Sequence, residues 1–281
     1  MENVIISDKK KLEELKDNIS KQGKDKLHII SDFDGTLTNE FIAGKKVPSI
    51  ISHLRSGNYL TYDYSKQAQD LYDKYHPIEI DSSIPIEERK AKMLEWWKTH
   101  FELLISSGLS KTDIEKLISD DKIKLREDTD KFLYILSKNN IPLVIMSSSG
   151  IGDAIPMVLS KTKLLFPNIS IISNEFVWKE DGKAMKVKEP IIHSLNKKEI
   201  ELKNYPVFEQ IKDRTNVILL GNSISDTQMV EGFNYENLIK IGFLNDESEV
   251  SKEEFKKNFD VVILGDGNLE FLNDLMFEMF G

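Results

Sequence analysis

The sequence predicts an α/β fold in which helices cover both faces of a parallel sheet, with a helical segment inserted after the first strand of that sheet. Three observations support this prediction. Short apolar runs alternate with helical patterns along most of the chain. Polar residues follow several of these runs where a strand would end. A long block of helical pattern separates the first such run from the second.

The chain begins with a predicted amphipathic helix and a predicted buried strand. The helix covers 8–20, where leucines and isoleucines recur on one face, and it ends at Gly23. The apolar run 27–30 then forms the strand. Residues 39–62 are predicted to be irregular, apart from a short helix around 50–54.

Four helices and then the remaining strands follow. Pro85 and Ser110 stand where the second and third of these helices begin, positions at which proline and serine are favoured. The predicted helices cover 65–75, 85–104, 110–120 and 128–139. The predicted strands cover 141–146, 169–173, 217–220, 238–241 and 261–264, with a hairpin of 176–179 and 183–186 around Glu180-Asp181-Gly182.

These elements predict two domains. Residues 1–46 and 128–281 are expected to form the core, and residues 47–127 are expected to form a helical cap that selects the substrate. Opening and closing of such a cap would exclude water from the reaction. The junctions 39–48 and 122–128 are the expected hinges.

Composition excludes several classes of protein. The chain has 281 residues, a net charge of -9 and no cysteine. The acidic balance argues against nucleic-acid and membrane partners, and the lack of cysteine excludes disulfides and thiolate metal sites. No apolar run approaches the ~18–20 residues of a membrane span, and the charged segment 1–19 has no signal-peptide core. A cytoplasmic location is therefore expected.

Two acidic residues end the first buried strand. Strand alternation points Asp32 and Asp34 to one side and Phe33 to the other, and Gly35 permits a tight turn. Buried carboxylates are costly unless they hold a cation or take part in chemistry. The segment 31–38, Ser-Asp-Phe-Asp-Gly-Thr-Leu-Thr, resembles the first signature of the haloacid-dehalogenase-like (HAD) phosphohydrolases. This resemblance implies a three-layer αβα Rossmannoid core with an inserted cap.

Polar residues also follow two later strands. Ser147-Ser148-Ser149-Gly150 follows the strand at 141–146, and Gly221-Asn222-Ser223-Ile224-Ser225-Asp226 follows the strand at 217–220. In open parallel sheets the site lies at the carboxyl ends of the strands. Taken singly, the serines are typical of an ordinary loop, and Lys197 is typical of a solvated surface. The set of Asp-x-Asp, serine, lysine and Gly-x-Ser-x-x-Asp, in this order along the chain, is specific for phosphoryl transfer.

Each residue of this set has a role in such chemistry. Asp32 can attack phosphorus, and Asp34 can protonate the leaving oxygen and then activate water. Lys197 can neutralise developing charge, and Ser148 can donate to a phosphoryl oxygen. Mg²⁺ is the expected cofactor. Its expected ligands are Asp32, Asp34, Asn222 and Asp226.

A closer resemblance extends from about residue 28 to near the C-terminus. The chain is similar to cytosolic 5'-nucleotidase III, the pyrimidine 5'-nucleotidase family. The segments that carry this similarity are 75–81, 93–97, 149–153, 192–197, 217–221 and 239–246.

The resemblance implies a Mg²⁺-dependent enzyme that dephosphorylates nucleoside 5'-monophosphates and can pass the phosphate to another nucleoside. It places the nucleophile on Asp32, the acid/base on Asp34, the phosphate-binding serine on Ser148 and the lysine on Lys197. It places substrate binding on Glu79, Trp96, Trp97, His100, Ser149 and Gly150.

Two cap residues bear on the choice of base. A carboxylate at Glu79 accepts hydrogen bonds from a base N–H and favours a cationic base. Adjacent helical positions point ~100° apart, so we expect one of Trp96 and Trp97 in the core and the other in the cleft. The resemblance implies that Trp97 is the one in the cleft, because the family's variable aromatic position falls there. The resemblance associates tryptophan at position 97 with 7-methyl-GMP, whose cationic base stacks well on tryptophan. UMP and CMP are the main expected substrates, and 7-methyl-GMP is the second.

The chain also departs from the family pattern. Asn222 stands where the family has a metal-binding aspartate, so the site loses one negative charge. The second strand end is one residue longer, so Ser147 competes with Ser148 for the phosphate. The segment 97–100 is one residue shorter, which leaves the role of His100 open, and Gly35 stands where methionine is common.

Two other functions remain open. One is a phosphatase for another small phosphomonoester such as phosphoserine, which the cap residues argue against. The other is a nucleotide-binding protein whose catalysis is weakened by Asn222. The sequence does not predict the oligomeric state.

Overall fold

The computed structural model describes residues 3–42, 44–46, 49–120, 122–197, 199–246 and 248–281. A seven-stranded sheet lies at the centre of this part of the chain, in the order β1-β11-β10-β9-β2-β5-β6. Strand β1 runs antiparallel to β11, and all other neighbours are parallel. The strands are β1 (Val4–Ile6), β2 (Leu27–Ser31), β5 (Leu143–Met146), β6 (Ile169–Ile172), β9 (Asn216–Gly221), β10 (Asn237–Leu244) and β11 (Val261–Leu264).

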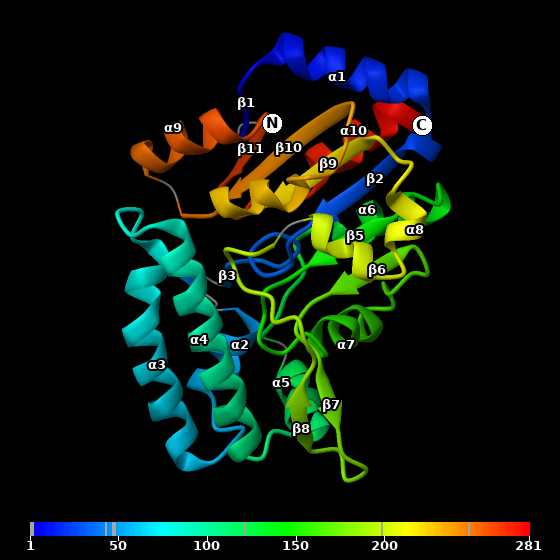
Figure 1. Cartoon of the computed structure of the whole chain (residues 1–281). Coiled ribbons are helices and arrows are strands. Elements are labelled where there is room, and N and C mark those ends of the chain that lie inside the picture. The colour runs from blue at the N-terminus through cyan, green and yellow to red at the C-terminus, as the bar shows by residue number, and fades with distance from the viewer. Residues whose placement is uncertain (1–2, 43, 47–48, 121, 198, 247) are drawn as a thin grey trace.

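Helices cover both faces of this sheet, which gives three layers (Figure 1). Alternate residues of a strand enter different hydrophobic clusters, as Ile29 and Ile30 of β2 do, because successive side chains point to opposite faces. One cluster joins the sheet to α1 (Lys9–Gln22), α6 (Thr129–Lys138), α7 (Ala154–Lys161) and α10 (Glu270–Phe280). The other joins it to α8 (Phe208–Ile211) and α9 (Glu249–Asn258).

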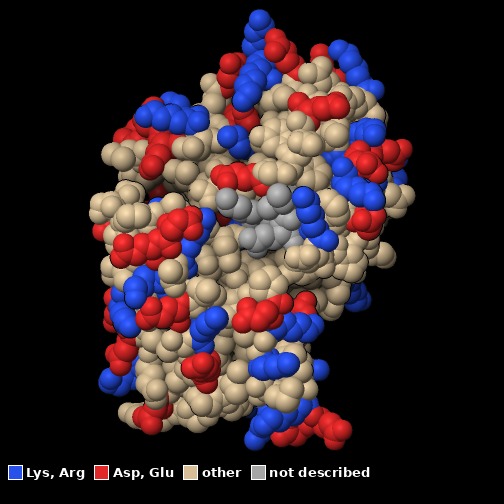
Figure 2. Space-filling model, viewed as in Figure 1, with Lys and Arg blue, Asp and Glu red and all other residues tan. Residues whose placement is uncertain are grey.

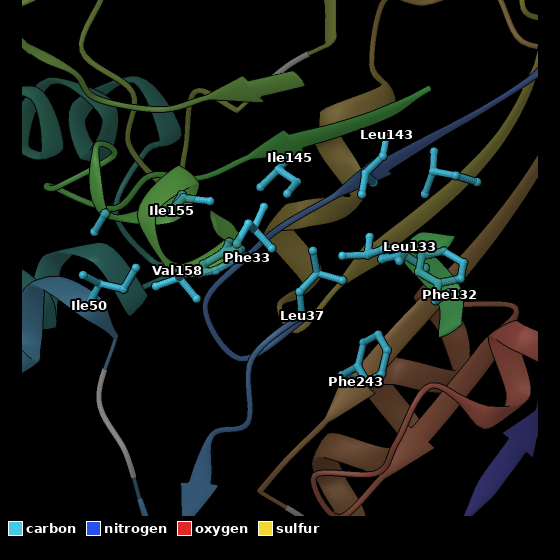
Figure 3. Packing of buried hydrophobic residues seen from close by; sticks show 14 of the residues in the cluster. Phe33, Leu37, Ile50, Phe132, Leu133, Leu143, Ile145, Ile155, Val158 and Phe243 are labelled. Carbon is cyan, nitrogen blue, oxygen red and sulfur yellow. The ribbon is translucent and has the colours of Figure 1, made fainter. Parts of the chain in front are cut away.

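The loop after β2 is anchored in the first of these clusters (Figure 3). Phe33 and Leu37 are fully buried there, together with Phe132 of α6 and Phe243 of β10. Burying the apolar residues on either side of Asp34 stabilises the loop in one conformation. The core therefore determines where the acidic residues of this loop lie.

The helical segment 50–119 lies beyond the carboxyl edge of the sheet, with α3 and α4 side by side (Figure 1). A hairpin of the core reaches the same region, because Ala184 N–H donates to Leu109 O at 2.8 Å and Phe101 meets Phe176 edge-on. The elements here are α2 (Ile50–Ser56), α3 (Tyr62–Ile80), α4 (Ile86–Ser106), α5 (Lys111–Ser119), β7 (Phe176–Trp178) and β8 (Ala184–Val187).

The two expected hinge segments are hydrogen-bonded to each other. Asn39 N–H donates to Lys124 O at 2.8 Å, and Arg126 N–H donates to Leu37 O at 3.0 Å. Residues 47 and 48, where the cap was expected to begin, lie outside the described residues. The domain boundaries stay a prediction.

The predicted element types are confirmed for the helices and strands of the sheet and cap, with shifts at their ends. Helix α3 is longer than predicted and continues through Pro77, and short strands β3 (Phe41–Ile42) and β4 (Lys45–Lys46) lie in the segment predicted to be irregular. Strand β1 was not predicted, because three residues carry too little periodicity. No helix in the described ranges is long and apolar enough to cross a membrane.

Candidate active site

Asp32 lies at the carboxyl end of β2, between β9 and β5. Its N–H donates to Leu220 O at 3.0 Å, so the pairing of β2 with β9 continues up to this carboxylate. The residue is 5% exposed, and Lys197 Nζ lies 2.5 Å from its Oδ1. Burial raises the pKa of Asp32, although the charge of Lys197 acts in the opposite direction.

Lys197 is buried, although composition alone suggested a solvated side chain. Its Nζ also donates to Asp226 Oδ1 at 3.1 Å. Burial acts to lower the pKa of Lys197, but the charges of Asp226 and Asp32 outweigh it and raise the pKa. The ammonium group is therefore held in its charged form beside the Asp32 carboxylate.

Asp226 was expected to bind a metal, and its hydrogen bonds argue against direct ligation. Its Oδ2 accepts the N–H groups of Asn222 and Ser223 at 3.2 and 3.0 Å, while its Oδ1 accepts from Lys197. Gly221 allows this arrangement, because a Cβ there would lie 2.5 Å from the Cβ of Asp226. Asp226 is thus placed to hold Lys197 and the loop after β9.

Asp34 faces the cap from the same loop as Asp32. Its Oδ1 accepts the N–H of Ile50, the first residue of α2, at 3.2 Å. Burial and the charge of Asp32 raise the pKa of Asp34 to about 7. A carboxyl group with such a pKa can both donate and accept a proton near neutral pH.

Oxygen donors for a cation converge beside this loop. The side chains of Asp32, Asp34 and Asn222 line one cavity of about 840 Å³. Gly35 has a φ of +70°, and a Cβ there would lie 2.3 Å from Asn222 Nδ2, so only glycine allows Asn222 this close. Hard oxygen donors of this kind suit Mg²⁺.

The donor set beside Asp32 combines carboxylates with a neutral amide. Among the described residues, no group of three or more histidines, cysteines, aspartates or glutamates is placed to hold a metal ion. A cation beside Asp32 would therefore need neutral oxygens, such as the side-chain oxygen of Asn222, in addition to the carboxylates.

A buried arginine, which the sequence analysis missed, fixes the loop after β2. Arg126 donates to Gly35 O and Thr36 O at 2.6 and 2.7 Å, and its Nη1 lies 3.0 Å from Asp266 Oδ1. It also donates to Asn245 Oδ1 at 2.6 Å. No local sequence signal marks Arg126, because its partners come from distant parts of the chain.

The serines after β5 have different environments. Ser147 is buried, and its Oγ accepts the N–H of Ser149 at 3.1 Å. Ser148 lines the cleft and is the better placed of the two to meet a phosphate. The buried Ser149 Oγ has no hydrogen-bond partner among the described residues, and Gly150 packs against Trp97.

Two cavities join into one cleft between core and cap. The cavity of about 840 Å³ contains the acidic residues and Lys197, and the second, of about 540 Å³, lies among the cap helices. Both are lined by Ser49, Ile51, His76, Glu79, Trp97, Ser148 and Ser194. The cleft therefore has a charged end at the sheet and an aromatic end in the cap.

Glu79 of α3 lies where these two ends meet. Its Oε1 accepts from Ser194 Oγ at 2.5 Å, and His76 Nδ1 lies 3.1 Å from its Oε2. Burial acts to raise the pKa of Glu79, but the hydrogen bonds from His76 and Ser194 outweigh it and lower the pKa. The carboxylate is thus held in its charged form.

The expectation that Trp96 and Trp97 divide between core and cleft is wrong. Both line the cap cavity, both are more than nine-tenths buried, and their rings stack at 6.0 Å between centroids. His100 stacks on Trp97 at 5.8 Å, and its Nε2 lies 3.1 Å from Tyr64 Oη.

His100 is neutral, and one of its ring nitrogens is engaged within the cap. Burial lowers its pKa to about 4, so the ring is neutral. With Nε2 engaged by Tyr64, the ring adds an aromatic surface to the cavity, and Nδ1 is its other polar atom.

Comparisons with known proteins identify the family. Residues 35–280 match the family described as pyrimidine 5'-nucleotidase (UMPH-1). A 7-methylguanosine phosphate-specific 5'-nucleotidase of Mus musculus is 35% identical over 97% of this chain and 91% of its own length. A protein of the same name from Drosophila melanogaster is 31% identical over 90% of this chain and 80% of its own length.

Solved structures agree with this assignment. The crystal structure of cytosolic 5'-nucleotidase IIIB bound to cytidine has a TM-score of 0.89 at 28% identity and covers 99% of this chain and 95% of its own. Apo phosphoserine phosphatase, at a TM-score of 0.53 and 17% identity, shares the fold over 88% of this chain and 97% of its own. The chain belongs to the pyrimidine 5'-nucleotidase family, whose members are phosphoric monoester hydrolases with the HAD fold.

Proposed function

We propose that this protein is a Mg²⁺-dependent 5'-nucleotidase that hydrolyses nucleoside 5'-monophosphates through an aspartyl-phosphate on Asp32. The observation that carries the proposal is the cleft itself. One end presents Asp32 paired with a buried Lys197, and the other presents the Trp96 and Trp97 rings. A phosphate and a nucleobase match these two ends chemically.

In the first step, an oxygen of Asp32 attacks phosphorus and the bond to the nucleoside 5' oxygen breaks. Asp34 gives its proton to that oxygen, for which a pKa of about 7 is well suited. Water then attacks phosphorus while Asp34 takes its proton, which releases phosphate and restores Asp32. Another nucleoside in place of this water would receive the phosphate.

Lys197 and Ser148 would hold the phosphoryl oxygens during both steps. Mg²⁺, when bound, would supply further positive charge beside these oxygens. Its ligands would be the Asp32 carboxylate, the Asp34 backbone carbonyl and the Asn222 side chain. Asp226 would hold Lys197 in place.

The aromatic end would select the base. A nucleobase would stack in the cap cavity and donate an N–H to Glu79. The buried Trp96 Nε1, which has no hydrogen-bond partner among the described residues, offers a donor there. UMP, CMP and 7-methyl-GMP are the proposed substrates. The names of the relatives support 7-methyl-GMP, and the cytidine-bound structure supports CMP.

Asn222 supports a second candidate, a nucleotide-binding protein with weakened catalysis. A neutral ligand in place of a charged one lowers the affinity for a cation. Against this candidate, the contacts of Lys197 with Asp32 and Asp226 are intact, and a protein that no longer catalyses has no need to keep two buried carboxylates around a lysine.

The test is phosphate release from UMP, CMP, 7-methyl-GMP, GMP and phosphoserine, with and without Mg²⁺. We expect Mg²⁺-dependent release from the first three and little from the last two. Equal turnover of 7-methyl-GMP and GMP would contradict the base selection. Binding of UMP without phosphate release at saturating Mg²⁺ would support the second candidate instead.

A further inference from the structure

The turn formed by residues 191–197 touches both ends of the cleft. It follows the β7–β8 hairpin and carries Lys197 at its end. The side chain of Asn196 closes the turn with two hydrogen bonds. Its Oδ1 accepts the N–H of His193 at 2.7 Å, and its Nδ2 donates to Ile191 O at 2.9 Å. These two hydrogen bonds fix the shape of the turn. A displacement of one of its residues therefore displaces the others.

The middle of this turn contacts the cap. Ser194 Oγ donates to Glu79 Oε1 at 2.5 Å, which joins the core to α3. Leu195 is 6% exposed and packs in one small hydrophobic cluster with Tyr75, Met93 and Trp96 of the cap helices. The two residues that face the cap thus meet the carboxylate and one of the indole rings that line the base cavity.

The ends of the turn contact the catalytic residues. Lys197 Nζ lies between Asp32 and Asp226. At the other end, Asn174 Oδ1 accepts the N–H of Ile192 at 2.8 Å, and Asn174 Nδ2 donates to Ser149 O at 3.1 Å. The turn is therefore tied to the nucleophile and to the serine loop after β5.

We propose that Ser194 and Leu195 are positioning residues that make the placement of Lys197 depend on a cap closed over a nucleobase. The inference rests on the proposed function and deepens it. A bound base adds contacts that stabilise the closed cap. The closed cap in turn contacts Ser194 and Leu195 and fixes their positions. Because the turn is closed by the hydrogen bonds of Asn196, Lys197 is then held beside Asp32. A phosphomonoester without a base gains none of this assistance.

The expected size follows from the bond that is lost. Ser194 donates its hydrogen bond to a carboxylate, so its loss should cost more than the loss of a hydrogen bond between neutral groups. Since Ser194 is only partly buried, its removal should lower kcat for UMP about tenfold. The effect should fall on kcat, because Lys197 acts on the reacting phosphate, whereas loss of a base contact alone would raise KM.

The experiment compares steady-state kinetics on UMP with kinetics on p-nitrophenyl phosphate, which has no nucleobase. The full-length protein is assayed as wild type, Ser194→Ala, Ser194→Thr, Leu195→Ala and Ser106→Ala. Ser194→Thr keeps the hydroxyl group. Ser106→Ala is the matched control, since Ser106 is an exposed serine on α4 whose Oγ donates to Leu103 O of the same helix at 3.1 Å.

We expect Ser194→Ala and Leu195→Ala to lower kcat for UMP about tenfold and to change p-nitrophenyl phosphate turnover less than about twofold. Ser194→Thr should restore most of the UMP rate, and Ser106→Ala should match the wild type. Equal losses on both substrates, or a rise in KM for UMP with unchanged kcat, would overturn the inference. A wild type that shows no preference for UMP over p-nitrophenyl phosphate would contradict the proposed function itself.

Discussion

The two ends of the cleft are built differently. At the sheet end, Asp32, Asp34 and Asn222 lie on loops that follow strands, and backbone hydrogen bonds fix those loops. At the cap end, Glu79 and Trp97 project from two helices, α3 and α4. One end concentrates buried charge and the other concentrates aromatic surface. This difference implies that reaction and selection are separable, so variants at each end should have distinct kinetic signatures.

The largest effect is expected at the sheet end, from Asp32→Asn. An amide is a poor nucleophile, so kcat should fall by about 10⁴-fold or more on UMP and on p-nitrophenyl phosphate alike. Lys197 keeps Asp226 as a partner, so the variant should remain folded. Phosphate release measures the activity, thermal unfolding measures the fold, and Asp213→Asn on the exposed surface is the control. Substantial activity in the folded Asp32→Asn variant would exclude Asp32 as the nucleophile.

A smaller, substrate-dependent effect is expected at the cap end, from Glu79→Gln. Losing a charged acceptor should lower kcat/KM for UMP about 10- to 100-fold and leave p-nitrophenyl phosphate nearly unchanged. The loss on 7-methyl-GMP should be larger, because its base is cationic. Glu102→Gln, an exposed position on α4, is the control. If Glu79→Gln weakened both substrates equally, the separation of the two ends would fail.

The sequence was informative about the sheet end because its signals are local. Asp32 and Asp34 stand together after a buried strand, and that pattern is visible without tertiary structure. Lys197 stands among other lysines, and it is buried only because Asp32 and Asp226 approach it from separate strand ends. The role of Arg126 could not be predicted for the same reason, because the carbonyl groups that it binds are far away in the sequence.

The cap end was harder to predict. Helical periodicity predicted α4 and the ~100° between the directions of adjacent side chains. It carried no information about the width of the cavity that these side chains line. Trp96 meets Tyr72 edge-on and stacks on Tyr75 of α3, and it still lines that cavity beside Trp97. Such packing between helices depends on the shapes of several side chains at once.

A moderate effect is expected from restoring charge at the sheet end with Asn222→Asp. One added negative charge beside Asp32 should lower the Mg²⁺ concentration for half-maximal activity about tenfold. Activity on UMP across a Mg²⁺ titration measures this, and Asn234→Asp at an exposed position is the control. An unchanged Mg²⁺ requirement would show that Asn222 does not contact the cation. The base preference should stay the same, because position 222 belongs to the other end of the cleft.

The smallest effect is expected at the cap end, from Trp97→Phe. A cation–π contact contributes about 0.5–1 kcal/mol at an exposed site and more when desolvated, and tryptophan is the best ring for it. Weakening this contact should lower kcat/KM for 7-methyl-GMP about two- to fivefold relative to UMP. Trp97 also packs on Gly150, so thermal unfolding must separate lost packing from lost stacking. Packing losses would affect both nucleotides equally. Trp96→Phe is the matched variant, because its ring lines the same cavity and stacks on Tyr75. If Trp96→Phe changed the ratio of 7-methyl-GMP to UMP turnover and Trp97→Phe did not, the base would stack on Trp96.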